Sequence, residues 1–528
     1  MDSPISKEDV SIRVSPHIGA SRSVAARLAD TQAAFIEKHK YTISEFTPDK
    51  EKKLRRKLYL TLVPLAMFIN LMLFTDKASL SYGSLLGLRD DTGVTETRYN
   101  NVNTLFYTGY VIAQFPGHYI MQRVPLSYFV SGSIMAWSLI ILLSCLVKNY
   151  GGLIAIRFLL GVTEACVLPA LEITLGMFFL PDEYTFLQPI FWISCVGAGI
   201  PSGFIAYGFL FVQGSIPAWK LFMILNGGAT FLLAIVCFFY YPSSPATARI
   251  LTIEERFHTI ERIHAATKSS IEQKVFRPYQ AYEALRDVST WLYFFIAFGL
   301  MISNNLLFQQ SVLFIQIGVT TFGSTLVFAV GSCFSVVCNL ITAPIIRRYP
   351  GYTAYWGAFW TLPGLVGGIG MISLPWNNTY GLLACLTLAC NTFGITYVLA
   401  LSQASSSASG YTKKLTRSAI YMIGYGVSNI ISPQIWVEKY GPRYYGAWAI
   451  QIVFSFVLAP ICFLLVRWVF IRRNKERRAW IAEQAASGNN GTGFVEQVND
   501  DGVLVKFEVE LSSLDLTDFE NKFFLYPM

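Results

Sequence analysis

Two charged residues stand side by side inside a long uncharged stretch near the start of the chain. Asp76 and Lys77 belong to the segment "NLMLFTDKASLSYGSLLGL" (residues 70–88), and no other charged residue occurs between Lys57 and Arg89. Ionised groups are costly in an apolar membrane interior and usually face a cavity or one another. Asp76 and Lys77 are therefore candidates for a functional site inside the membrane. The alternative is that both are interface charges whose side chains reach toward the outer surface.

The direction of the two side chains follows from helix geometry. Consecutive residues of a helix point about 100° apart. Asp76 and Lys77 are thus expected to serve different partners.

A second group of charges lies in "AIRFLLGVTEACVLPALEITLG" (residues 155–176). Arg157 and Glu164 are seven residues apart, nearly two helical turns, which places them on one face with the small Gly161 beside them. Arginine keeps its proton there, whereas a glutamate in a low dielectric can take one up near neutral pH, so the pair fits proton-coupled binding of an anion. The alternative is a structural ion pair that joins this helix to the first one. Glu172 lies near the inner end and is interpreted as mostly structural.

Uncharged amides in later apolar spans are further candidates. In most membrane proteins such amides hydrogen-bond neighbouring helices, so each one alone is better explained as packing than as a ligand. The cluster in the seventh span is the exception. With the two cations, the predicted substrate-binding residues are Lys77, Arg157, Asn304, Asn305, Gln309 and Asn429.

The elements that position these residues must be membrane helices. Of the 528 residues 53% are hydrophobic and 14% charged, whereas soluble domains carry about a quarter of their residues as charges. Apolar spans of about 20 residues, long enough to cross the hydrocarbon, recur along the chain. The twelve spans are residues 58–82, 102–122, 126–147, 151–172, 188–211, 218–240, 290–316, 322–346, 353–374, 379–402, 416–437 and 446–470. The sequence predicts an all-α membrane protein with twelve transmembrane helices.

Basic clusters predict the orientation of the chain. They precede the first and eleventh spans and follow the eighth and the last, with even numbers of crossings between them, so all lie on the side that the positive-inside bias makes cytoplasmic. The clusters are "KEKKLRRK" (50–57), Arg347 with Arg348, Lys413 with Lys414, and "RRNKERR" (472–478). Both termini are predicted to be cytoplasmic, and the plasma membrane is the expected location. The net charge of +8 gives no reason to expect nucleic acid as a partner, because the basic clusters flank apolar runs.

A polar stretch in the middle divides the chain into two halves. The turns "IMQRVP" (120–125) and "IIRRYP" (345–350) end the second span of each half and indicate a repeat. Thr252 and Glu255 have capping-box spacing, and Ile253, Phe257 and Ile260 share one face of the predicted linker helix. The predicted divisions are an N-terminal tail (1–57), a first half (58–240), a cytoplasmic linker (241–289), a second half (290–471) and a C-terminal tail (472–528).

The end of the tail allows two interpretations. Residues 485–528 are rich in Gly, Asn and Asp and are expected to be disordered. The alternative is that "KFEVELSSLDLTDFENKFF" (506–524) is a docking segment.

The chain lacks the usual signatures of enzymes and metal sites. No phosphate-binding loop, dinucleotide fingerprint or metal-spaced Cys/His cluster occurs, so we expect no enzyme activity, cofactor or metal. The nine cysteines fall inside apolar runs and are interpreted as packing residues.

Several segments together resemble a known family. They are the twelve spans with a central loop, "RFLLGVTEA" (157–165), the two turns above, and "ASGYTKKLTRSAIYMIGYGVSNIISPQ" (408–434). They resemble the major facilitator superfamily, within it the anion:cation symporters, and most closely the fungal allantoate permease branch. The resemblance covers almost the whole chain.

The resemblance implies roles for four residues. In that family an Asp-Arg pair on helix one and an Arg-x6-Glu pattern on helix four are associated with proton coupling and carboxylate recognition. They match Asp76, Lys77, Arg157 and Glu164, which makes Asp76 and Glu164 the proton-coupling residues. Lysine replaces the commoner arginine and lacks its two-pronged grip on a carboxylate. The loop between helices two and three also lacks the acidic residue of the usual signature.

The predicted function is proton-coupled symport of a small organic anion by alternating access, in a protein that acts as a monomer in the lipid bilayer. The substrate stays open among allantoate, ureidosuccinate, small peptides, vitamin carboxylates and sulfonates. One alternative is a proton-coupled drug antiporter, since "GAGIPSG" (197–203) partly resembles the antiporter motif but has the wrong Gly-Pro spacing. The other is a nutrient sensor that does not transport.

Overall fold

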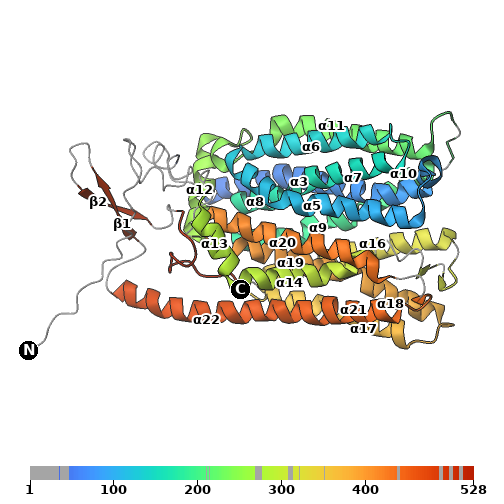
Figure 1. Cartoon of the computed structure of the whole chain (residues 1–528). Helices are drawn as coiled ribbons and strands as arrows, with labels where there is room; N and C mark the ends of the chain where they lie inside the picture. Colours follow the sequence, from blue (N-terminus) through green and yellow to red (C-terminus); the bar gives the residue numbers. More distant parts are fainter. Residues whose placement is uncertain are drawn as a thin grey trace, which may run out of the picture.

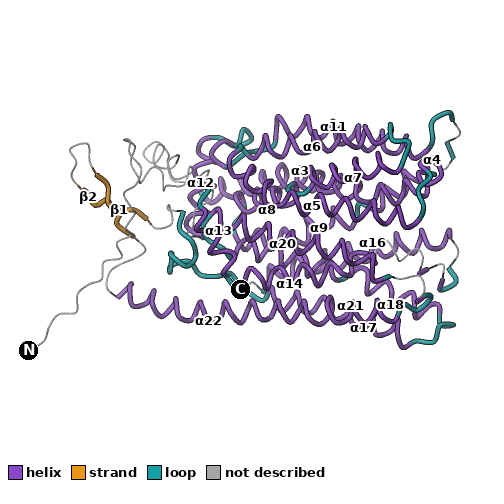
Figure 2. Tube along the Cα trace, in the orientation of Figure 1, coloured by secondary structure: helices purple, strands orange, loops and turns teal. Residues whose placement is uncertain are grey.

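The computed structural model describes most of the chain. The described residues are 35, 47–209, 211–212, 214–267, 276–306, 313–314, 316–319, 321–349, 351–436, 440–486, 492–498, 504–510 and 515–528. They form a bundle of long helices joined by short loops (Figure 2), with the first and second halves of the chain lying beside each other (Figure 1).

The first half contains six spans, two of them made of two helices in succession. Its helices are α3 (Pro48–Leu85), α4 (Leu88–Thr92), α5 (Glu96–Arg123), α6 (Leu126–Ser144), α7 (Tyr150–Glu164), α8 (Val167–Phe178), α9 (Pro181–Val196), α10 (Gly199–Phe209) and α11 (Ala218–Tyr240). Here α7 with α8 and α9 with α10 form one span each, and α4 is a short helix in a loop.

The second half repeats this plan. Its elements are α14 (Val288–Ile302), η2 (Ser303–Asn305), α16 (Thr321–Arg348), α17 (Thr353–Ser373), α18 (Thr379–Asn391), α19 (Phe393–Ser406), α20 (Tyr411–Ile431), η3 (Ser432–Ile435), α21 (Tyr445–Gln451), η5 (Ile452–Leu458) and α22 (Ala459–Ala486). Here α18 with α19, and α21 with η5 and α22, each form one span.

The described helices account for the twelve predicted spans. Eight are long and apolar enough to cross a membrane by themselves, and α14 joins them when it is counted with the bent linker helix before it. The other three are α5, α17 and α20. Helices α5 and α20 pack on each other across the two halves and carry polar side chains there, which explains why their hydropathy is lower. The predicted fold class is confirmed.

The outer surface of the bundle is apolar. Many large hydrophobic side chains are exposed along its helices, among them Leu60, Leu143, Phe238, Phe239 and Leu465. A soluble monomer rarely exposes so much apolar surface, whereas acyl chains cover it in a membrane. Cys333 belongs to this exposed set, so the prediction that every cysteine packs inside is wrong for that residue.

Helices α5 and α7 approach each other with backbone contact. A Cβ atom on Gly161 would lie 1.9 Å from the carbonyl oxygen of Phe106, and one on Gly109 would lie 2.3 Å from that of Phe158. Small residues allow such contact between membrane helices. This contact fixes α7, which carries Arg157 and Glu164, against α5.

Two helices of the central linker cover one end of the bundle, here called the linker face (left in Figure 1): α12 (Ile253–Thr267) and α13 (Pro278–Arg286). The predicted capping box of α12 is present, since Thr252 N donates to Glu255 at 2.9 Å and Glu255 N donates to the Thr252 hydroxyl at 3.3 Å. Burial raises the pKa of the Glu255 carboxyl, but the Lys57 ammonium and Thr252 outweigh burial and hold it below its usual value. Phe257 is buried, whereas Ile253 is 55% exposed, so the shared face predicted for them is wrong at Ile253.

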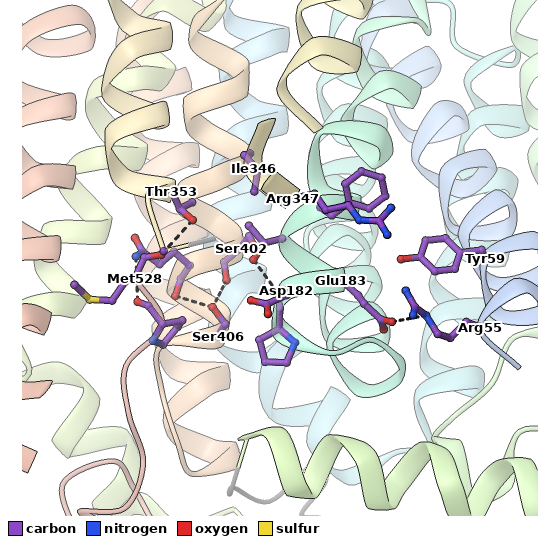
Figure 3. A pocket seen from close by; sticks show the side chains of 16 residues that line it. Arg55, Tyr59, Asp182, Glu183, Ile346, Arg347, Thr353, Ser402, Ser406 and Met528 are labelled. Carbon is purple, nitrogen blue, oxygen red and sulfur yellow. Dashed lines mark hydrogen bonds and ion pairs between the residues drawn. The ribbon is translucent and has the colours of Figure 1, made fainter. Parts of the chain in front are cut away.

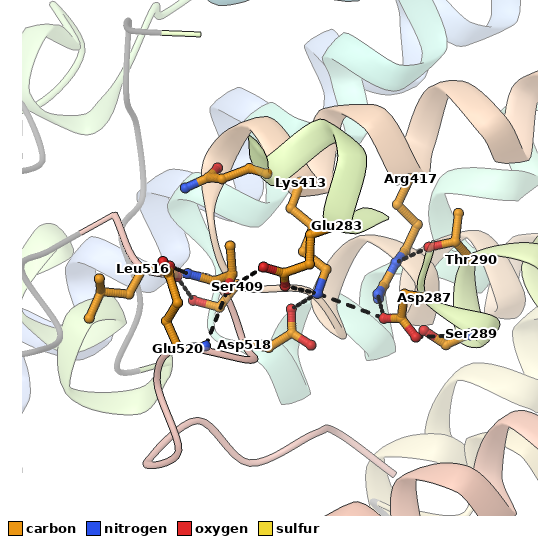
Figure 4. Close-up of polar contacts among 12 residues, drawn as sticks. Glu283, Asp287, Ser289, Thr290, Ser409, Lys413, Arg417, Leu516, Asp518 and Glu520 are labelled. Carbon is orange, nitrogen blue, oxygen red and sulfur yellow. Dashed lines mark hydrogen bonds and ion pairs between the residues drawn. The ribbon is translucent and has the colours of Figure 1, made fainter. Parts of the chain in front are cut away.

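The C-terminal tail is ordered in two places, so the expected disorder is wrong there. Strands β1 (Thr492–Val498) and β2 (Leu504–Glu510) pair antiparallel, with Thr492 opposite Glu510. Residues 515–528 pack on the linker face (Figure 4). This confirms the docking alternative for the part of segment 506–524 that begins at Asp515.

Charge pairing holds the docked tail. Lys413, at the start of α20, is fully buried and lies 2.7 Å from both Glu283 of α13 and Asp518 of the tail. Its neighbour Asp287 pairs with Arg417 at 2.7 Å (Figure 4). Burial raises the pKa of Asp287, but Arg417 and the other cations around it outweigh burial and hold the pKa well below its usual value. Asp287 therefore stays ionised at neutral pH.

Candidate functional site

Asp76 points into the first half of the bundle. Its side chain is 2% exposed, Oδ1 accepts a hydrogen bond from the Ser79 hydroxyl at 3.2 Å, and Oδ2 is buried without a hydrogen-bond partner among the described residues. Ser79 also accepts a hydrogen bond from Arg157 at 3.2 Å. Asp76 and Arg157 are thus joined through one hydroxyl, without an ion pair within 4.0 Å in the described part of the chain.

Lys77 points the other way, toward the second half. Its ammonium lies 4.7 Å from the centre of the Phe74 ring, 5.6 Å from Tyr110 and 5.3 Å from Tyr425. It also donates to the Tyr425 hydroxyl at 3.4 Å. Ring faces attract a cation but leave its charge unneutralised. The prediction that Asp76 and Lys77 serve different partners is confirmed.

The rings around Lys77 come from both halves of the bundle. Phe74 lies on α3 and Tyr110 on α5, while Tyr425 lies on α20. Tyr107 extends the cluster and contacts Tyr425 with ring centres 5.9 Å apart. Among the described residues no carboxylate lies within 4.0 Å of the Lys77 ammonium, which leaves this cation available to an anion.

Glu164 is the last residue of α7, where the helix four span is interrupted before α8 begins at Val167. Its side chain is 1% exposed, and neither carboxylate oxygen has a hydrogen-bond partner within the described ranges. It is close enough to Asp76, Lys77 and Arg157 to interact with all three electrostatically. An interrupted span that carries such a group is common at the binding sites of transporters.

The structural ion pair considered for helix four does not form. No carboxylate of the described residues lies within 4.0 Å of the Arg157 guanidinium, which instead donates to Ser79 of α3. The two helices are therefore connected, but by a hydrogen bond from the arginine to a neutral hydroxyl.

The predicted amides divide into three groups. Asn304 donates to Asn429 at 2.7 Å, and Asn429 donates to the backbone of Tyr425 at 2.8 Å, so this pair joins helices as the alternative expected. Asn305 is buried, and its Nδ2 has no partner among the described residues. Gln309 and its neighbour Gln310 lie outside the described residues. Because Asn429 lies one helical turn after Tyr425 on α20, the pair of Asn304 and Asn429 lies near the aromatic rings that surround Lys77.

Sequence reasoning missed the aromatic residues and the bridging serine. Tyr107 with Tyr110, and Tyr421 with Tyr425, have helical spacing in spans rich in small residues. From that spacing the sequence could have predicted that each of the two helices carries tyrosines on one face and that these faces meet. Ser79 carried no comparable signal.

A cavity lies between the halves at the linker face (Figure 3). Its volume is about 290 Å³, and its lining includes Arg55 and Glu183 from the first half with Arg347 and Ser402 from the second. Arg55 and Glu183 pair at 2.8 Å. The last residue, Met528, also lines the cavity, so the docked tail reaches its edge.

Comparison with known proteins identifies the family of this bundle. The model of the Major Facilitator Superfamily matches residues 66–433. The chain belongs to this superfamily. The proton:xylose symporter XylE, solved with 6-bromo-6-deoxy-D-glucose, has a similar structure, with a TM-score of 0.61, 11% identity, and coverage of 78% of this chain and 94% of XylE.

The relatives of this major facilitator protein are fungal transporters. An uncharacterized transporter of Schizosaccharomyces pombe is 48% identical over 504 residues, covering 95% of this chain and 88% of the relative. The high affinity cysteine transporter of Saccharomyces cerevisiae is 46% identical over 511 residues and 96% of each chain. The allantoate permease of that yeast is 29% identical over 500 residues, covering 92% of this chain and 88% of the permease. The predicted family resemblance is confirmed: the chain is a multi-pass membrane transporter of fungal type and not an enzyme.

Proposed function

We propose that this major facilitator protein is a proton-coupled importer of a small substrate bearing a carboxylate, and that cysteine is the first substrate to test. The observation that carries the proposal is the environment of Lys77. Its ammonium is held by rings from both halves, has no carboxylate within 4.0 Å among the described residues, and is close enough to Glu164 to interact with it electrostatically.

Charge balance links substrate and proton in this site. With all groups ionised, Asp76 and Glu164 offset Lys77 and Arg157. Protonation of one carboxylate leaves one net positive charge, which favours the entry of a substrate carboxylate. Loss of the proton removes this positive charge, so the substrate anion is released together with the proton, as symport requires.

The site also suits a zwitterion. A carboxylate can pair with Lys77, while an ammonium group is attracted by the surrounding tyrosine rings and by an ionised Asp76 or Glu164. The 46% identity to a cysteine transporter supports an amino acid as the substrate. The smaller identity to allantoate permease keeps other small carboxylates as competitors in the test.

We infer that the linker face is cytoplasmic and that the protein acts as a monomer in the plasma membrane. The basic residues Arg55, Arg347, Lys413 and Arg473 all lie at this end of the bundle, in agreement with the positive-inside bias. The two halves, divided near residues 241–289, then alternate in opening to either side around the central charges.

Uptake into yeast cells that lack their own cysteine uptake tests the function. Cells expressing the protein should accumulate radiolabelled cysteine faster at acidic external pH, and a proton uncoupler should abolish the accumulation. Unlabelled allantoate, ureidosuccinate and nicotinate serve as competitors that rank the carboxylates. Failure of the well-expressed protein to accumulate any of these compounds would refute the proposal in favour of an exporter or a sensor.

A further inference from the structure

A third carboxylate is buried in the membrane-spanning part of the first half, away from Asp76 and Glu164. Glu172 on α8 is 2% exposed. Its Oε2 accepts hydrogen bonds from the Tyr184 hydroxyl and from Gln188, both at 2.6 Å. Its Oε1 is buried without a hydrogen-bond partner, and no cation of the described residues lies within 4.0 Å of it.

This environment differs from that of a carboxylate with a purely structural role. A buried ion is normally paired with a cation, and its polar atoms are normally satisfied. Asp287 meets both conditions, with Arg417 at 2.7 Å and Arg473 at 2.9 Å. Glu172 meets neither, because two neutral donors share one oxygen and the other oxygen is bare. A group of this kind in a membrane span is a functional candidate.

Glu172 lies between the central charges and the linker face. It follows Glu164 by eight residues, which is about 12 Å along a helix. Six residues further on, α8 ends at Phe178, whose carbonyl accepts a hydrogen bond from Arg262 of the linker helix α12. The carboxylate therefore lies on the side of the site that leads to the cavity at the linker face.

Tyrosines from both halves lie near this carboxylate. Tyr184 of α9 donates a hydrogen bond to it, and Tyr397 of α19 and Tyr421 of α20 are close enough to interact with it electrostatically. Ser402 of α19 lies beside the Tyr184 hydroxyl and also lines the cavity of about 290 Å³ (Figure 3). Because α8 and α9 belong to one half and α19 to the other, movement of the halves changes access to Glu172.

The same tyrosines lead back toward the central site. The hydroxyls of Tyr110 and Tyr397 both donate to the Met422 sulfur, at 3.6 Å and 3.7 Å. Tyr110 interacts electrostatically with Glu164, and Tyr397 with Glu172. A layer of tyrosines thus connects the two carboxylates.

We propose that Glu172 is a second proton-carrying carboxylate, which accepts the proton given up by Glu164 and delivers it past Tyr184 to the cavity at the linker face. One proton leaves the Glu164 carboxyl group, protonates the Glu172 carboxylate, and then passes to water in the cavity, so no other reactant is needed. The step rests on the proton coupling proposed above. It gives the proton an exit separate from the path of the substrate.

Infrared titration tests whether Glu172 takes up a proton, without reference to any substrate. In purified protein in lipid nanodiscs, the carbonyl stretch of protonated carboxyl groups is followed over pH. Glu172→Gln should remove one titrating band and Glu164→Gln a different one. Tyr184→Phe, which deletes one donor to the carboxylate, should shift the midpoint of the Glu172 band upward. A spectrum unchanged by Glu172→Gln would overturn the proposal, and the Tyr184→Phe shift decides the matter if Glu172→Gln does not fold.

Transport in proteoliposomes tests the role of that proton. Glu172→Gln should slow uptake driven by a pH gradient by about 100-fold or more, the lower end of the range for loss of a proton-transfer group, and should slow counterflow exchange much less. Glu172→Asp should restore part of the loss, which a packing defect would not. Wild-type rates in Glu172→Gln would refute its role in proton release. A wild-type protein without proton-coupled uptake would instead refute the proposed function, and the infrared result would still decide whether Glu172 is a proton site.

Discussion

Removal of the Lys77 charge is expected to weaken substrate binding steeply. Three rings lie within 5.6 Å of the Lys77 ammonium and Lys77 is partly buried, so its interaction with a bound carboxylate is stronger than at the surface. Hydrogen bonds to charged groups contribute up to about 3 kcal/mol, which corresponds to a rise in KM of roughly 100-fold for Lys77→Met. Lys77→Arg keeps the charge and can stack on the rings, so its KM should rise by about tenfold or less.

The assay is the concentration dependence of radiolabelled cysteine uptake, scaled to the amount of protein in the plasma membrane. Lys148→Met is the matched control, because Lys148 is an exposed residue remote from the site, between α6 and α7. This variant should retain the wild-type KM. A well-expressed Lys77→Met protein with a KM within about threefold of wild type, less than 1 kcal/mol, would refute the role of Lys77 and leave Arg157 as the cation of the site.

Three further predictions concern folding and orientation. Gly161→Ala should reduce the yield of folded protein, because its Cβ would lie 1.9 Å from the Phe106 carbonyl oxygen, whereas Gly176→Ala, with open space around it, should not; size-exclusion profiles compare the two. Lys413→Met should lower the free energy of unfolding by about 3 kcal/mol or more, because Glu283 and Asp518 lose their partner. Its melting temperature should therefore fall, and a melting temperature equal to that of wild type would contradict this. Cysteine introduced at Glu483, exposed near the end of α22, should react with an impermeant maleimide only after the cells are permeabilised, and labelling of intact cells would reverse the proposed orientation.

The helices and the central charges were predictable because each rests on a local property of the sequence. Apolar length defines a span, and a charge inside a span is conspicuous, so Asp76, Lys77, Arg157 and Glu164 were found without a structure. Helical periodicity also predicted that the side chains of Asp76 and Lys77 point in different directions. Three spans with lower hydropathy were still recognised, because even these carry far fewer charges than the linker.

The partners of those charges were not predictable, because they come from distant parts of the sequence. Tyr425 is 348 residues from Lys77, and tyrosines are common in membrane helices, so nothing local links the two. The docking of the tail depends on charge pairs such as Asp518 with Lys413 and on burial of Tyr526 against Phe470, and both sets of partners are distant in the sequence. Composition, which sees only a polar segment, therefore favoured disorder. The absence of a cation beside Glu172 within the described residues is likewise visible only in three dimensions.

Accumulation driven by a pH gradient, compared between wild type and Glu164→Gln, tests the central claim most directly. In proteoliposomes without a membrane potential, one pH unit supplies about 1.4 kcal/mol per proton, enough for about tenfold accumulation of cysteine at one proton per substrate. We expect the wild-type protein to approach this ratio. Glu164→Gln should only equilibrate cysteine across the membrane, while still exchanging it in counterflow. Uphill accumulation by both Glu164→Gln and Asp76→Asn would contradict the assignment of proton coupling to these carboxylates.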